Sequence, residues 1–112
     1  MKANDELRQY RSTDNYYRHP LRMLFTDGVK ALCDKFECYW FLDVVCSYQP
    51  GLKGEDFQVW SLNVNEDCSA KVICTDGNGQ TLKTQNIMFT DFRAKFAEIW
   101  IEGNVILLPS EH

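Results

Sequence analysis

The stretch 57-FQVWSLNVNEDCSAKVICTDGNGQTL-82 decides the fold class, because its first eight residues alternate between two faces. Successive side chains of a strand point to opposite sides of a sheet, so Trp60, Leu62 and Val64 share one face. This spacing predicts a strand over residues 57–64 with one apolar face.

The same stretch contains the strongest turn signal of the chain, DGNG at residues 76–79. Gly and Asn tolerate the positive φ angles that tight turns require. The residues before the turn, KVICT at 71–75, are rich in the β-branched side chains that favour strands. We therefore expect a β-hairpin whose second strand runs over residues 82–89. The glycines match neither the P-loop spacing nor GxGxxG, so they do not predict a phosphate-binding loop.

Two more strands are expected downstream. Residues 96–101 alternate again, and residues 105–108 follow after a Glu-Gly-Asn turn. Both segments are short and are separated by a tight turn, which favours antiparallel pairing.

Upstream of residue 57, the apolar spacing changes to that of a helix. Thr26 is an expected N-cap, and Asp27 places negative charge in the first turn, where the helix dipole favours it. Apolar residues then recur at i, i+3, i+4 and i+7, at Val29, Leu32, Cys33 and Phe36.

Residues 38–48 are apolar almost throughout, so a buried strand and a buried helix both fit. The apolar segment is longer than a usual strand. Trp40, Val44 and Tyr48 also form a row with helical spacing. We therefore expect a helix that ends before Pro50.

With a short helix near the start, these elements predict an α+β fold. Two or three N-terminal helices pack on one face of an antiparallel sheet of about five strands. The 112 residues fit one domain spanning residues 1–112, with residues 1–14 as a loosely packed N-terminal segment.

Charge and composition narrow the classes of partner. The net charge of −4 disfavours general binding to nucleic acid or to an anionic membrane, because both depend on excess lysine and arginine. No apolar run reaches the roughly 18 residues of a spanning helix, and the start MKANDELRQY lacks the apolar core of a signal peptide. The five cysteines are odd in number and lie mostly among apolar residues, as expected for reduced thiols. We therefore expect a cytoplasmic protein.

Several short motifs occur in a characteristic order along the chain. They are YRH at 17–19, TDGVK at 26–30, YWFLD at 39–43, SYQ at 47–49, FQVW at 57–60, TDF at 90–92 and LLPSE at 107–111. On these residues the chain resembles a family of small bacterial and phage proteins that is classed only as a domain of unknown function. The resemblance implies one compact domain and assigns no activity, cofactor or site residue. The phage members of that family imply a link to phage or mobile elements.

The segment NYYRHPLRMLFTDGV at residues 15–29 mixes aromatic and cationic side chains. Its candidate partner-binding residues are Tyr16, Tyr17, Arg18, His19 and Arg22. Tyr and Arg are favoured at protein interfaces, and the same mixture can stack on bases and hold phosphates. The simpler interpretation is that the rings pack on the core while the charged groups reach solvent.

An enzyme is the alternative hypothesis. It would use His19 as acid or base, with Asp27 or Asp43 as the orienting carboxylate. Asp43 interrupts an apolar segment, so we expect it to be partly buried and bound to a donor such as an N-terminal arginine. Cys38 lies at a helix junction and is the least core-like cysteine, which makes it the candidate nucleophile. The Cys and His spacing lacks the two close pairs of a zinc site, so neither a metal nor a cofactor is expected.

The sequence therefore favours a small non-enzymatic binding or regulatory protein that acts through a protein–protein surface. Its protein partner is unidentified, and a homodimer is also open, since edge strands and aromatic residues offer a two-fold interface. Weak nucleic-acid binding through Tyr17, Arg18 and Arg22 is a further alternative, and the negative net charge disfavours it.

Overall fold

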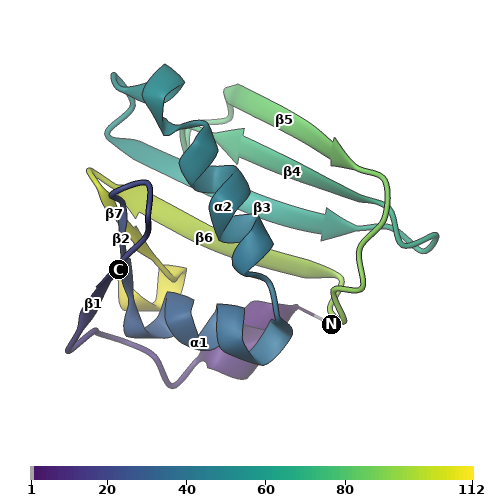
Figure 1. The fold of residues 1–112 in the computed structure, drawn as a ribbon, viewed down its shortest axis with the longest axis horizontal. Helices are drawn as coiled ribbons and strands as arrows, with labels where there is room; N and C mark the ends of the chain where they lie inside the picture. Colours follow the sequence, from purple (N-terminus) through teal and green to yellow (C-terminus); the bar gives the residue numbers. More distant parts are fainter. Residues whose placement is uncertain (1) are drawn as a thin grey trace.

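A computed structural model describes residues 2–112, which form two α-helices, three short 3₁₀ helices and a seven-stranded sheet (Figure 1). The helical elements are η1 (Ala3–Leu7), α1 (Asp27–Phe36), α2 (Tyr39–Ser47), η2 (Gln49–Leu52) and η3 (Pro109–Glu111). The strands are β1 (Tyr16–Arg18), β2 (Leu24–Thr26), β3 (Phe57–Val64), β4 (Ala70–Thr75), β5 (Thr81–Ile87), β6 (Phe96–Glu102) and β7 (Val105–Leu107). The predicted α+β class, with helices before the main strands, is confirmed.

The strand order is β1-β2-β7-β6-β3-β4-β5, so β1 and β5 are the two edges. Neighbouring strands are antiparallel except β2 and β7, which pair in parallel. The sequence predicted the five strands from β3 to β7, including the hairpin around DGNG, but not β1 and β2. These two have three residues each, which is too short for a readable alternation.

Both α-helices begin where the sequence predicts. The Val29 N–H donates to the Thr26 hydroxyl at 3.3 Å, which makes Thr26 the N-cap of α1. Glu37 ends this helix in a left-handed conformation with φ 53°. Residues 38–48 were open to two interpretations, and the helical one is confirmed by α2.

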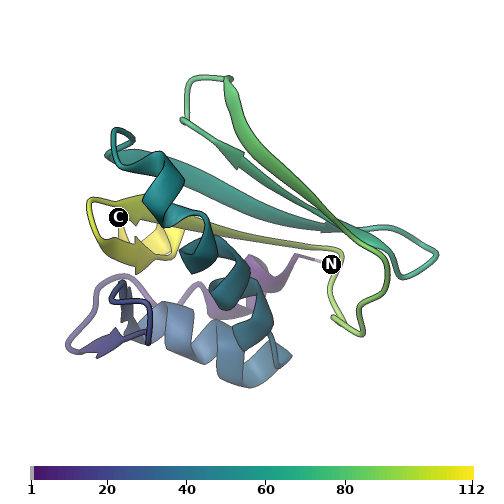
Figure 2. The ribbon, with the colours of Figure 1, turned by 45° about the horizontal axis from the view of Figure 1, so that its top comes forward.

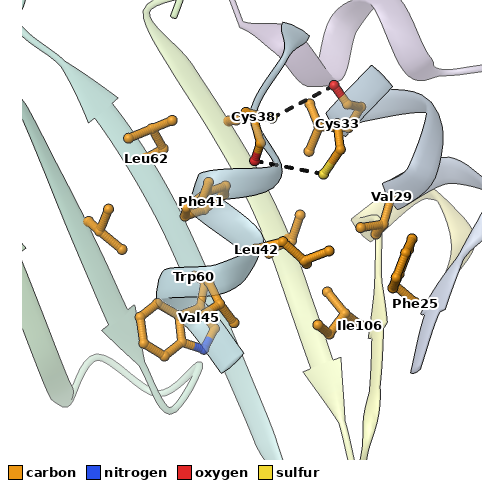
Figure 3. Close-up of a cluster of buried hydrophobic side chains, with 14 of the residues drawn as sticks. Phe25, Val29, Cys33, Cys38, Phe41, Leu42, Val45, Trp60, Leu62 and Ile106 are labelled. Atoms are coloured by element: carbon orange, nitrogen blue, oxygen red, sulfur yellow. Dashed lines mark hydrogen bonds between the residues drawn. The ribbon is translucent and has the colours of Figure 1, made fainter. Parts of the chain in front are cut away.

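Helix α2 lies across one face of the sheet, over β3 and β6 (Figures 1 and 2). Phe41, Leu42 and Val45 of α2 are buried, and Figure 3 shows them beside Trp60 and Leu62 of the sheet. Burying each such side chain contributes about 1.5–3 kcal/mol, so this contact supplies much of the core.

The expected N-terminal helix is present as the 3₁₀ helix η1. Ala3 and Leu7 are buried in the hydrophobic core. Asn4 binds the backbone of Glu98 in β6 twice: its Nδ2 donates to the carbonyl at 2.9 Å, and its Oδ1 accepts the N–H at 2.7 Å. The Asn4 side chain thus makes the two hydrogen bonds that a neighbouring strand would make, and these bonds fix η1 to β6.

The C-terminal η3 closes onto the start of α1. Glu111 accepts hydrogen bonds from the Thr26 hydroxyl at 2.6 Å and from the Gly28 N–H at 3.1 Å. A carboxylate is favoured here because the helix N-terminus carries unpaired N–H groups and partial positive charge. A Cβ on Gly28 would lie 2.6 Å from Glu111 Oε1 and 2.7 Å from Leu108 Cδ1, so the close approach requires glycine.

Replacing this carboxylate should destabilise the fold. For Glu111→Ala we expect the free energy of unfolding to fall by about 1–2 kcal/mol, because the N-terminus of α1 loses an anionic cap. Urea denaturation followed by Trp fluorescence measures the change. Glu66→Ala, in the exposed β3–β4 turn, is the matched control. An equal loss in both variants would contradict a capping role for Glu111.

Candidate functional site

The predicted partner-binding residues lie on one hairpin, formed by β1, β2 and the loop 19–23 between them. The loop is closed by two backbone hydrogen bonds: the His19 N–H donates to the Met23 carbonyl, and the Arg22 N–H donates to the His19 carbonyl, both at 2.8 Å. Because β1 is an edge of the sheet, this hairpin is bordered by solvent on one side.

His19 is buried beneath the hairpin loop, with 6% of its surface exposed. Its Nε2 lies 2.6 Å from Asp43 Oδ1, and its Nδ1 accepts the Leu21 N–H at 3.0 Å. A backbone N–H can only donate, so Nδ1 must be the acceptor and Nε2 carries the proton that is donated to Asp43. Both ring nitrogens are therefore occupied: Nε2 joins the hairpin to α2, and Nδ1 closes the loop on itself.

Asp43 differs from the expectation in two respects. Its side chain is 68% exposed, so the prediction that it is partly buried is wrong. Its partner is His19 and not an arginine. The apolar neighbours of Asp43 in sequence belong to the buried sides of α2, whereas Asp43 itself lies at the surface where the hairpin approaches the helix.

Tyr17 faces inward and is partly buried. Its ring stacks on Phe25 with the centroids 5.5 Å apart, and its hydroxyl donates to Asp27 Oδ1 at 3.0 Å. Asp27 also accepts the backbone N–H groups of Asp14 and Asn15. These donors, that of Asp14 foremost, hold the pKa of Asp27 below its ordinary value. Tyr17 and Asp27 therefore join the hairpin to the start of α1, and Asp27 does not contact His19 in this arrangement.

The outward side of the hairpin carries the remaining candidates. Tyr16 is 58% exposed, and Arg18 and Arg22 are also exposed. Neither arginine side chain donates a hydrogen bond to any residue within 2–112. The sequence did not single out Leu21, which is 55% exposed at the tip. The sequence does contain a signal for the exposure of Leu21, because the residue directly follows Pro20 in a turn and turns lie at the surface.

Arg22 has a left-handed backbone with φ 77°. This conformation is rare for residues other than glycine and costs on the order of 1 kcal/mol. It persists because the His19 contacts and the two backbone hydrogen bonds fix the loop from both sides. The turn is thus fixed by hydrogen bonds, and the side chains of Leu21 and Arg22 at its tip are exposed.

A groove of about 970 Å³ lies next to the hairpin, between the N-terminal segment and α1. Its lining includes Tyr10, Arg11, Tyr17, Asp27 and Lys30, and it does not include His19. Most of its charges are already paired, since Lys30 contacts Asp34 at 2.7 Å and Asp27 is held as described above.

The cysteines are mostly part of the core. Cys38 is fully buried, so the prediction that it is the least core-like cysteine is wrong; the exposed one is Cys68. A hydrogen bond with Cys38 and burial raise the pKa of Cys33, and burial raises the pKa values of Cys46 and Cys74 to about 12. These thiols stay protonated and are poor nucleophiles. Within residues 2–112, no three His, Cys, Asp or Glu side chains are grouped to hold a metal.

Fold and surface define a small α+β protein with a basic hairpin at one edge of its sheet, held to α2 by His19. Residues 1–112 match a family of unknown function (DUF6876), and the protein belongs to this family. No curated protein and no solved structure matches the chain. In the part of the chain that the structure describes, no helix is long and apolar enough to cross a membrane.

The buried histidine should be needed for stability. We expect His19→Ala to lower the free energy of unfolding by about 2–3 kcal/mol, because it removes a buried ring and two hydrogen bonds. His112→Ala replaces the other histidine, which is about half exposed and contacts Glu102 and the Trp100 ring, and should lower stability by only about 0.5–1 kcal/mol. Urea denaturation of both variants tests this difference. A loss for His19→Ala no larger than that of the control would contradict it.

Asp27 should contribute stability that depends on pH. Its pKa is lowered in the folded protein, so its contribution is complete above the unfolded value of 3.8 and is lost as pH falls through the lower folded value. Asp27→Asn should therefore be destabilised relative to wild type at pH 7, and the difference should shrink at pH 3. Denaturation curves at both pH values measure this, with Asp91→Asn as the control for charge. A difference that grows on acidification would contradict the assignment.

Proposed function

We propose that this protein is a cytoplasmic, non-enzymatic binding or regulatory protein. In this proposal its partner is an acidic segment of another protein, and the binding surface is the outward side of the hairpin. We call this surface the hairpin tip; it consists of Tyr16, Arg18, Leu21 and Arg22. The observation that carries the proposal is the use of both His19 ring nitrogens to hold the tip in place.

Rigid presentation supports a binding role. A flexible loop loses conformational entropy when it binds, and each immobilised side chain adds a cost of about 0.5–1.5 kcal/mol. The backbone of the hairpin tip is already fixed by the His19 contacts, so much of this cost is met during folding. A strained Arg22 backbone in an exposed turn is also more typical of functional sites than of ordinary loops.

The side chains of the hairpin tip indicate the chemistry of the partner. Arg18 and Arg22 are unpaired within the described part of the chain, and a carboxylate can bind a guanidinium through two parallel hydrogen bonds. Leu21 and Tyr16 supply apolar contact area between the charges. This combination fits a peptide segment in which acidic residues flank an apolar one. The net charge of −4 disfavours nucleic acid as the partner.

The enzyme hypothesis stays second. The 2.6 Å contact between His19 and Asp43 resembles the geometry in which a carboxylate orients a catalytic imidazole. A general base, however, needs a free lone pair on the other nitrogen, and the Leu21 N–H occupies that position. This arrangement favours a structural role for the pair.

Selection of random displayed peptides against the purified protein tests the proposal. We expect enrichment of acidic peptides with an apolar residue, and a loss of affinity of at least tenfold in Arg22→Glu, because a guanidinium–carboxylate pair becomes a repulsive one. Affinity is measured by fluorescence anisotropy with a selected peptide.

Lys53→Glu is the matched control, since it makes the same charge change at an exposed position in the loop before β3. It should bind the peptide as the wild type does. Equal losses in the two variants would show that net charge, and not the hairpin tip, governs binding. Failure to enrich any acidic peptide would also count against the proposal.

A further inference from the structure

The opposite edge of the sheet carries the second unusual surface. Strand β5 pairs with β4 alone, so its outer side directs N–H and C=O groups into solvent. It has seven residues, TLKTQNI, of which only Lys83 is charged. Natural sheet edges are usually protected by charges, by proline or by shortness. The edge strand β1, with three residues, follows this pattern, whereas β5 has no proline and one charge, and its register shift near Leu82 leaves Lys83–Ile87 regular.

Two large apolar side chains follow β5 directly. Met88 is 94% exposed and Phe89 is 71% exposed, the two highest values among the large hydrophobic residues that the structure describes. The chain then returns to the core at Thr90, whose N–H donates to the Cys68 carbonyl at 2.8 Å. The exposed pair is therefore held beside the free edge. We call β5 together with Met88 and Phe89 the β5 edge.

We infer that the β5 edge is the interface of a homodimer, in which β5 pairs antiparallel with β5 of a second copy about a two-fold axis. The sheets of the two copies then form one continuous sheet. This interface goes beyond the hairpin tip of the proposed function, because the two surfaces lie at opposite ends of the strand order.

Self-pairing is favoured by the sequence of the strand. A two-fold axis perpendicular to the sheet must lie midway between the two β5 strands, so that one residue of β5 faces its own copy across the axis. With the axis at Gln85, counting along the chain places Met88, just past the end of β5, near Leu82 of the second copy, where the β5 register shifts, and Phe89 near Thr81. Leu82 is half-buried and apolar, so this register covers Met88 best. With the axis at Thr84, Met88 would instead lie opposite Gln80.

The position of the single charge of β5 also favours symmetric pairing with β5 of a second copy. In the register centred on Gln85, Lys83 lies opposite Ile87, so the only charge of the strand does not meet itself. Head-to-tail assembly from β5 to β1 would leave most of the seven-residue edge unpaired, because β1 is much shorter. The symmetric pairing therefore closes as a dimer and does not continue as a fibre.

The size of the interface sets the expected affinity. The strand is about 23 Å long, and two apolar side chains extend it, so the buried area lies near or below the ~800 Å² per partner of standard stable complexes. The dimer should be concentration-dependent, with a dissociation constant on the order of tens of micromolar.

Sedimentation velocity over a range of protein concentrations tests the inference. The wild type should shift from monomer to dimer, and the double variant Met88→Ser, Phe89→Ser should raise the dissociation constant at least tenfold. Both positions are exposed, so the variant should still fold. Leu21→Ser removes another exposed apolar side chain, at the hairpin tip, and should dimerise as the wild type does.

Disulfide trapping tests the register. In a Cys68→Ser background, which removes the exposed thiol, Gln85→Cys should form an intermolecular disulfide on mild oxidation, since residues facing each other across antiparallel strands lie about 4.5–5.5 Å apart. Thr81→Cys should not, because its two copies would be about 26 Å apart.

Three results would overturn the inference. They are a wild type that stays monomeric at high micromolar concentration, a double variant that dimerises normally, and equal trapping at positions 81 and 85. Loss of peptide binding in Arg22→Glu bears only on the hairpin tip, so the two proposals fail independently.

Discussion

The structure depends on the burial of α2. Asp43 is the only charged residue among its nine, so most of the helix surface must be covered by the sheet and its neighbours. One side of α2 covers the sheet at Trp60 and Leu62. The single charge of α2 lies where the hairpin approaches, and there it receives the His19 hydrogen bond. The apolar helix α2 is therefore also the element that positions the hairpin tip, through Asp43.

Polar side chains fix the places where elements distant in sequence meet. Asn4 holds η1 to β6, Glu111 holds η3 to α1, and His19 holds the hairpin to α2. Gln58 acts in the same way inside the core, where it joins Trp60 to Gln49. Apolar packing tolerates small shifts, whereas each of these hydrogen bonds requires one geometry, so together they define the relative placement of the helices and the sheet.

Elements with a strong local signal were predictable. The alternation at Trp60 and Leu62, the DGNG turn and the cap at Thr26 each specify an element without reference to the rest of the chain. Strands β1 and β2 are too short for such a signal, and β2 joins the sheet by pairing with β7, about eighty residues away. The contact of His19 with Asp43 and the burial of Tyr17 against Asp27 likewise arise only when distant segments meet. The sequence therefore identified the segment that carries the hairpin tip but not which of its side chains face outward.

The parallel pairing of β2 with β7 has a consequence for how the protein folds. Leu24 and Phe25 find their partners, Val105 and Ile106, only when the last strand of the sheet is in place. Closing so long a loop lowers the entropy of the chain before any contact stabilises the product. The pairing of β2 with β7 is therefore expected to form late in folding. A chain that is still folding can thus bury α2 on β3 and β6 while its hairpin remains unordered. The hairpin tip therefore takes its final conformation only after β7 has joined the sheet.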